Sequence, residues 1–166
     1  MMIRRLNPDD ALEFVELRRN ALAAAPQAFA ASPEDDVAAS LDYVREALGS
    51  SEQAVFGAFA PDLVGSVGIY RDRHVKASHK CHLWGMWVAE DSRRKGIGRG
   101  LVEEALDFAR GMGGVTHVHL SVSEAAEEAL ALYRCMGFTT WAIEPAALKV
   151  AEKVLSEQHM VRLLTP

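Results

Sequence analysis

The stretch from residue 82 to residue 109, HLWGMWVAEDSRRKGIGRGLVEEALDFA, decides the fold of this chain. Residues 82–88 are all apolar, aromatic, histidine or glycine, which is typical of a strand covered on both faces. Residues 92–100, SRRKGIGRG, follow with four cations and three glycines. The apolar residues after them fall on one face of a helix, and they are Leu101, Val102, Ala105, Leu106 and Ala109. The stretch therefore predicts a central strand that turns through glycines into an amphipathic helix.

The glycine turn, residues 92–100, has the properties of an anion-binding site. The first N–H groups of a helix lack partners within it, and the helix dipole adds positive potential there. Glycines let the backbone approach an anion closely, and the cations neutralise its charge. The turn therefore predicts a pyrophosphate site; the alternative is a glycine-broken turn with solvated cations. The candidate binding residues are Arg93, Arg94, Lys95, Gly96, Ile97, Gly98 and Arg99.

Two other phosphate-binding motifs do not fit the glycine turn. A P-loop requires a glycine followed by Lys-Ser or Lys-Thr, and the turn contains neither pair. The dinucleotide-binding fingerprint G-x-G-x-x-G requires a glycine at position 101, which is Leu101. The P-loop is therefore excluded, and the dinucleotide fingerprint is a poor match.

The composition of the whole chain limits which ligands and partners the protein can have. The 166 residues suit one domain over residues 1–166, and 49% apolar with 25% charged residues is typical of a globular protein. The net charge of −5 argues against nucleic acid as a partner. Cys81 and Cys135 match no metal-ligand spacing, so we expect no metal. No run of about 18 apolar residues occurs, and no signal peptide is recognisable, so we expect a cytoplasmic protein without a membrane partner.

Periodicity places the other elements around the central stretch. An Asn-Pro-Asp-Asp start at residues 7–10 and a Ser-Pro-Glu-Asp start at residues 32–35 predict two helices, and Gly49 ends the second. The second helix has the apolar stripe Val37, Leu41, Val44 and Leu48. Strands are expected at 2–6, 54–59, 63–70, 115–122, 138–144 and 159–164, a further helix at 124–136, and the segment 145–158 is ambiguous.

Residues 82–88 carry two further expectations. Gly85 in the middle of the strand indicates a bulge or a close approach to the backbone. Strict alternation would place Trp84 and Trp87 on opposite faces of the sheet. It would also place His82 on the same face as Trp84, Met86 and Val88.

The glycine turn and a second motif together resemble the GCN5-related N-acetyltransferases, the GNAT family. The family motif of Arg or Gln, two residues, Gly, one residue, and Gly or Ala corresponds to residues 93–98. The family follows it with a helix, a strand and A-x-x-L-Y-x-x-x-G-F, which corresponds to residues 129–138. Both motifs stand in the family's order and separation. The resemblance covers essentially the whole chain and implies an α/β fold: a mixed, mostly antiparallel sheet flanked by helices, with splayed central strands.

The resemblance implies direct transfer of an acetyl group from acetyl-CoA to a primary amine. The CoA pyrophosphate would sit on the backbone amides of residues 94–99. The pantetheine arm would pair like an extra strand with Met86, Trp87 and Val88, and the Val88 amide would polarise the thioester carbonyl. The acceptor is expected to be an amine-bearing small molecule, peptide or protein, and the chain to be a monomer or homodimer.

Two residues are catalytic candidates. Tyr133 matches the family tyrosine that protonates the departing thiolate; the alternative is a core aromatic on an amphipathic helix. His82 lies where some members of the family place a catalytic base; the alternative is a structural histidine. His159 is a further candidate to line the same cleft.

The chain departs from the family pattern at Ala126, where many members carry an asparagine that contacts the ligand. Ser121 and Ser123 are candidates to compensate for the missing side chain. The alternative function is a non-catalytic CoA-binding sensor, in which Tyr133 and His82 only pack. Nucleic-acid binding by the glycine turn is disfavoured, because the chain is acidic and no exposed aromatics are interleaved with the turn.

Overall fold

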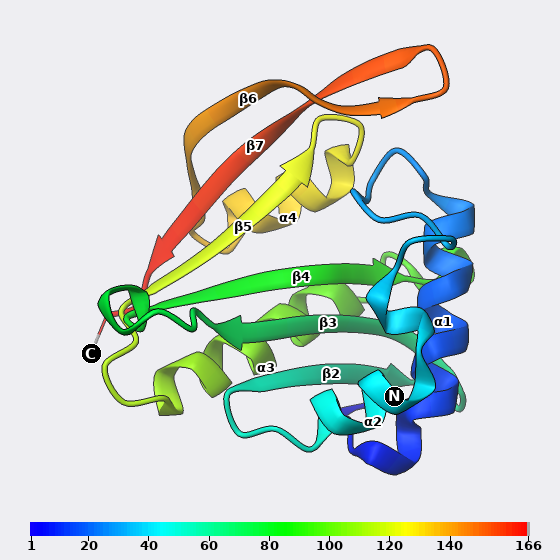
Figure 1. Cartoon of the computed structure of the whole chain (residues 1–166), viewed down its shortest axis with the longest axis vertical. Helices are drawn as coiled ribbons and strands as arrows, with labels where there is room; N and C mark the ends of the chain where they lie inside the picture. Colours follow the sequence, from blue (N-terminus) through cyan, green and yellow to red (C-terminus); the bar gives the residue numbers. More distant parts are fainter. Residues whose placement is uncertain (166) are drawn as a thin grey trace.

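Seven strands form one mixed sheet in the computed structural model, which describes residues 1–165 (Figure 1). The strand order is β1-β2-β3-β4-β5-β7-β6, and only the β4–β5 pair is parallel among the described strands. The expected mixed, mostly antiparallel sheet with a central β4 is therefore confirmed. The strands are β1 Met2–Arg5, β2 Gln53–Phe59, β3 Leu63–Arg71, β4 Lys80–Val88, β5 His117–Ser123, β6 Thr139–Val150 and β7 Lys153–Leu163.

Helices cover both faces of this sheet (Figure 1). On one face lie α1 (Ala11–Ala24) and α2 (Leu41–Leu48), which pack on the strands of the N-terminal half. On the other face lie α3 (Ile97–Gly111) and α4 (Glu127–Cys135). A capping box at Asn7 and Asp10 starts the first helical segment, as the Asn-Pro-Asp-Asp signal predicts.

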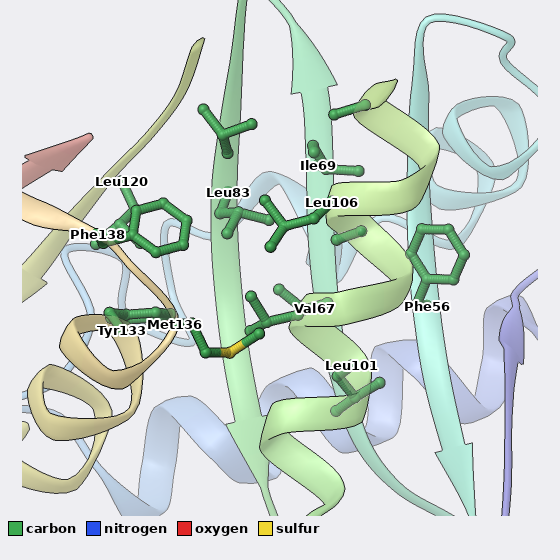
Figure 2. Close-up of a cluster of buried hydrophobic side chains, with 14 of the residues drawn as sticks. Phe56, Val67, Ile69, Leu83, Leu101, Leu106, Leu120, Tyr133, Met136 and Phe138 are labelled. Carbon is green, nitrogen blue, oxygen red and sulfur yellow. The ribbon is translucent and has the colours of Figure 1, made fainter. Parts of the chain in front are cut away.

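The main core lies between α3 and the sheet (Figure 2). Leu101 and Leu106 of α3 are almost completely buried against Val67 and Ile69 of β3. Tyr133, Met136 and Phe138 extend the same cluster from α4 and the residues after it. The apolar stripe of α3 thus fixes the helix to the sheet, and with it the glycine turn at its N-terminus.

The expected bulge in β4 is present at Gly85. Ser66 of β3 faces Trp87, whereas Gly68 faces Trp84, so β4 has one residue more than β3 in this interval. Gly85 has a φ of +62°, a conformation that favours glycine.

The bulge makes the alternation predicted for β4 wrong. Trp84 packs edge-on against Phe14 of α1 with ring centroids 6.3 Å apart, and Trp87 lies 6.3 Å from Phe29 in the segment after α1. The two tryptophans therefore lie on the same face, because the extra residue between them reverses the side-chain alternation. Met86 and Val88 instead pack into the α3 core, so His82 shares its face with Trp84 but not with them.

Two other expectations also need correction. The Ser-Pro-Glu-Asp segment forms a turn, and α2 starts later, because Ser40 caps it by accepting from the Tyr43 N–H. Val37 is consequently 65% exposed and lies outside the helix. The ambiguous residues 145–158 belong to a long β6–β7 hairpin with register breaks.

Candidate functional site

A cavity of about 1440 Å³ lies where β4 and β5 separate. The two strands pair only through residues 80–82 of β4 and 117–119 of β5, and beyond these residues they diverge. The cavity is lined from both faces of the sheet. Within the described chain, its lining includes all predicted site residues except Lys95 and Ser123. The Lys95 ammonium instead donates to the Asp91 carbonyl at 2.9 Å.

The glycine turn needs two of its glycines for different reasons. Gly96 is the N-cap of α3 and has a φ of +78°, which side-chain-bearing residues adopt at a cost. A Cβ at Gly98 would lie 2.9 Å from Met86 Cε and 3.2 Å from Leu132 Cδ2. The first glycine therefore sets the backbone direction, and the second keeps the turn close to the cavity wall.

The cations of the turn are partly engaged with protein groups. Arg93 donates from Nε to the Val88 carbonyl at 3.0 Å, and its guanidinium lies 4.8 Å from the Trp87 ring centroid. Arg99 pairs with Glu103 at 2.9 Å. Arg94 is 89% exposed and lies 3.6 Å from Glu128. Arg93 thus holds the end of β4 to the turn, whereas Arg94 and Arg99 place exposed positive charge around the turn.

The Val88 amide faces the gap between β4 and β5. The Ala89 N–H donates to the Val64 carbonyl of β3 at 2.8 Å, so Ala89 directs its N–H toward β3. Successive N–H groups of a strand point to opposite sides, so the Val88 N–H points away from β3. Because β5 has already diverged at this level, a bound chain can accept from this amide.

Tyr133 is both a core aromatic and a cavity residue. It lies on α4, is 5% exposed, and packs edge-on against Phe138 with ring centroids 5.7 Å apart. Its side chain also lines the cavity. Burial raises the pKa of Tyr133 above its ordinary value, so the hydroxyl keeps its proton at neutral pH.

His82 is held by a carboxylate that the sequence patterns did not reveal. Its Nε2 lies 3.2 Å from Asp72 Oδ2, and its ring stacks on Tyr70 with centroids 5.0 Å apart. Hydrogen bonds from the His74 N–H and the His82 ring lower the pKa of Asp72 to about 2. Asp72 therefore remains a carboxylate over the whole neutral range.

His82 begins a row of rings that crosses the sheet on the α1 face; we call it the aromatic row. The centroids are 5.8 Å apart for His82 and His119, 6.4 Å for His119 and Trp141, and 5.7 Å for Trp141 and His159. Burial, together with the charges of His82 and Lys80, lowers the pKa of His119, which favours its neutral form. Of these residues the sequence patterns pointed only to His82 and His159.

His159 is bonded on both sides of its ring. Its Nδ1 lies 2.9 Å from Ser121 Oγ on β5, and its Nε2 lies 2.9 Å from Glu144 Oε2 on β6. Neighbouring Glu157 has a raised pKa, mainly through burial and also through Glu144. Ser123, the other serine expected to compensate for Ala126, is buried and caps the Ala125 N–H at 3.2 Å.

Residues 1–165 contain no group of His, Cys, Asp or Glu side chains arranged to hold a metal ion. Among these residues no helix has the length and hydropathy needed to cross a membrane.

Comparisons with known proteins agree with this geometry. Residues 15–138 match the family model described as the acetyltransferase (GNAT) family. The N-alpha-acetyltransferase RimI of Mycobacterium tuberculosis is 47% identical over 77 residues, which are 46% of this chain and 45% of that relative. The match thus spans less than half of the relative's length.

Solved structures resemble the fold over nearly its full length. The yncA protein of Salmonella typhimurium, solved with its cofactor acetyl-CoA, has a TM-score of 0.84 at 20% identity and covers 100% of this chain and 95% of its own. A ribosomal-protein-alanine N-acetyltransferase from Brucella melitensis has a TM-score of 0.82 at 21% identity and covers 99% of this chain and 100% of its own. These structural likenesses concern the fold.

Proposed function

Since the chain belongs to the acetyltransferase (GNAT) family, we propose that it is an N-acetyltransferase that transfers an acetyl group from acetyl-CoA directly to a primary amine. The family resemblance of the two sequence motifs is confirmed by the match over residues 15–138. The observation that carries the proposed activity is the cavity between β4 and β5, which has the glycine turn at one end and Tyr133 and His82 in its walls.

The α3 side of the cavity fits acetyl-CoA. The turn at Gly96 presents N–H groups of the α3 N-terminus to a pyrophosphate, and a side chain at position 98 would have to displace the end of Met86. Met86, Trp87 and Val88 offer a strand end to the pantetheine arm, and the Val88 amide is the donor for the thioester oxygen. Acetyl-CoA supplies the activated acetyl group, and these residues bind and orient it.

Tyr133 is proposed as the acid that protonates the leaving thiolate. It lines the cavity from α4, and its hydroxyl is protonated at neutral pH, as an ordinary tyrosine is with a pKa of about 10, so a proton is available when the thiolate forms. The ring is fixed by packing against Phe138, so the hydroxyl needs little ordering on substrate binding.

His82 is proposed as a base for the acceptor nitrogen. When Nε2–H donates to Asp72, Nδ1 keeps its lone pair and accepts a proton. Asp72 stabilises the imidazolium that results, because its low pKa keeps it ionised. The same pair holds the ring in one orientation against Tyr70.

The acceptor is proposed to be a peptide or protein N-terminus, with small amines as the alternative. The α1 side of the cavity carries Glu157 and the paired carboxylates Asp72 and Glu144 near its aromatic row, which suits a cationic amine. The names of the Mycobacterium tuberculosis and Brucella melitensis proteins point in the same direction.

Release of free thiol from acetyl-CoA tests the proposed activity. The panel contains a hexapeptide with a free N-terminal alanine, the same peptide with a blocked N-terminus, a polyamine and an aminoglycoside. We expect thiol release with the free peptide and none with the blocked one. Binding of acetyl-CoA without turnover on any amine would favour the sensor, and the absence of a thermal shift with acetyl-CoA would refute both functions.

A further inference from the structure

We propose that Ser121, His159 and Glu144 form a proton relay that deprotonates the incoming ammonium, so that the site contains two proton acceptors with separate tasks. This inference rests on the proposed acetyltransferase function. Its basis is a second imidazole–carboxylate pair in the same cavity, His159–Glu144, in addition to the His82–Asp72 pair.

The chemistry of the acceptor nitrogen requires two proton removals. A primary ammonium loses one proton to expose the lone pair that attacks the thioester. The nitrogen of the tetrahedral adduct then carries a positive charge and loses a second proton before the amide forms. Tyr133 only donates, to the thiolate, so both protons need acceptors elsewhere in the cavity.

Register places the two imidazole–carboxylate pairs on one face of the sheet. Ser121 of β5 is directly opposite His159 of β7, and His82 of β4 is directly opposite His119 of β5. His119 therefore lies between the two pairs. It has no carboxylate partner among its described contacts, and its lowered pKa disfavours a charge there. The two pairs are thus separate proton acceptors rather than one network.

The relay balances in protons and electrons. With Nε2–H donated to Glu144, His159 Nδ1 accepts the Ser121 hydroxyl proton at 2.9 Å. The ammonium N–H bond breaks as its proton passes to Ser121 Oγ, and the electron pair stays on nitrogen. The serine O–H bond breaks as its proton passes to Nδ1, so Ser121 is neutral before and after. The product is an imidazolium at His159 beside the Glu144 carboxylate.

The groups around His159 favour this direction of transfer. Glu144 contacts the ring from β6, and Glu157 lies two residues away on β7. Ser121 lies opposite His159 on β5, with His119 two residues farther along that strand. Trp141 covers the ring at a centroid distance of 5.7 Å. Both carboxylates attract the ammonium and stabilise the imidazolium. Glu144 is 52% exposed at its side chain, which gives the proton an exit to water.

The positions of the two imidazole–carboxylate pairs indicate which proton each pair accepts. Ser121 is exposed, so its hydroxyl meets the charged amine as it enters. His82 and His159 are equally exposed, at 27%, but Asp72 is more enclosed than Glu144, at 20% against 52%, and His82 lies on the central strand that ends at Val88. His82 is therefore the acceptor for the proton of the adduct.

The pH dependence of acetylation of the free alanine hexapeptide tests this assignment. Near pH 6 the α-amine is mostly ammonium, and near pH 10 it is neutral, since its usual pKa is about 8. S121A, H159Q and E144Q should lose on the order of 10²-fold in kcat/KM near pH 6 and approach the wild type near pH 10. H82Q should remain slow at both pH values. H117Q, a matched histidine variant on the same face of β5 but outside the cavity lining, should behave as the wild type.

An equal loss at all pH values in S121A and H159Q, or no loss, would overturn the relay. A thermal shift with acetyl-CoA checks folding of every variant. If the wild type does not acetylate the peptide, the proposed acceptor fails, and ring ¹⁵N shifts of His159 still test the relay. Nδ1 should be the acceptor nitrogen and respond to S121A, while Nε2 should respond to E144Q; shifts unchanged by both substitutions would refute it.

Discussion

Arg93 donates from Nε to the Val88 carbonyl at 3.0 Å and thereby fixes the first cation of the glycine turn to the last residue of β4. The sequence patterns indicated that Arg93 neutralises phosphate charge, but this contact also sets the distance between the turn and the strand end. The proposed pyrophosphate site and the proposed thioester site lie on these two segments. Their relative position therefore depends on a side chain between them.

Arg93→Ala should weaken acetyl-CoA binding by at least about tenfold, because a hydrogen bond to a charged donor contributes about 1.5–3 kcal/mol and a cation–π contact to Trp87 is lost with it. Lys95→Ala should change the affinity only slightly, because that ammonium bonds to Asp91. Calorimetric titration with acetyl-CoA measures both. Equal affinities for the two variants would show that Arg93 does not organise the site.

Gly96→Val and Gly98→Val should each abolish acetyl-CoA binding. Valine at 96 resists a φ of +78° and would turn the first N–H groups of α3 away, and valine at 98 would collide with Met86 and Leu132. Thermal shifts with acetyl-CoA compare them with Lys95→Ala as the charge control. If all three variants lost affinity equally, charge rather than the shape of the turn would determine binding.

The cofactor side of the site was largely predictable because its residues are contiguous. The β4 pattern, the glycine turn and the α3 stripe occupy residues 82–109, and local signals specify each of them. The Gly85 bulge was also visible as a glycine in a strand. Its effect on the faces of Trp84 and Trp87 was not, because a pattern does not show how many residues the bulge adds.

The acceptor side was mostly not predictable from the sequence. Its residues come from or follow five different strands and are brought together only by the pairing of those strands. Asp72 reaches His82 from the loop after β3, and Ser121, His159 and Glu144 come from β5, β7 and β6. None of these residues has a spacing signal to another. The predicted start of α2 was wrong for a related reason. Ser32 and Ser40 are both residues that often cap helices, and only the structure shows that Ser40 is the cap.

Tyr133→Phe should lower turnover on the order of 10²-fold with little change in acetyl-CoA affinity. The substitution removes only the hydroxyl, and the ring contact with Phe138 remains. Steady-state thiol release and calorimetric titration separate the two effects. Unchanged turnover would show that Tyr133 only packs in the core and does not act as the acid.

Cys81 and Cys135 should differ in thiol reactivity. Cys81 is completely buried, and burial raises its pKa to about 11, whereas Cys135 is exposed. A thiol reagent at neutral pH should label only Cys135 in the native protein and both after denaturation.

The raised pKa of Cys81 also predicts a loss of stability at alkaline pH. The Cys81 thiol has a higher pKa in the folded state than in the unfolded state, so its contribution to stability is fully present below the unfolded-state pKa. This contribution decreases as the pH rises from that value toward 11. The free energy of unfolding should therefore fall over this range more in the wild type than in Cys81→Ala. Parallel curves for the two proteins would contradict the assignment.

Asp72→Asn and His82→Gln should lower turnover by similar factors, and the double variant should be little slower than either one. The reason is that Asp72 acts through His82, to whose Nε2 it is bonded at 3.2 Å. The low pKa of Asp72, about 2, keeps it ionised throughout the assay range, so its own titration contributes no limb to the pH profile. Any limb of the pH–turnover profile that disappears in Asp72→Asn therefore reports the titration of the His82 imidazole.

A double-mutant cycle on kcat measures this coupling, with acetyl-CoA affinity as the check that the cofactor side is intact. His74→Ala is the matched control, because His74 also contacts Asp72 but its ring is 91% exposed and it does not line the cavity. It should leave turnover and the pH profile unchanged. Additive effects of the Asp72 and His82 substitutions would mean that the carboxylate acts on the acceptor independently, as part of its binding site, rather than by positioning the base.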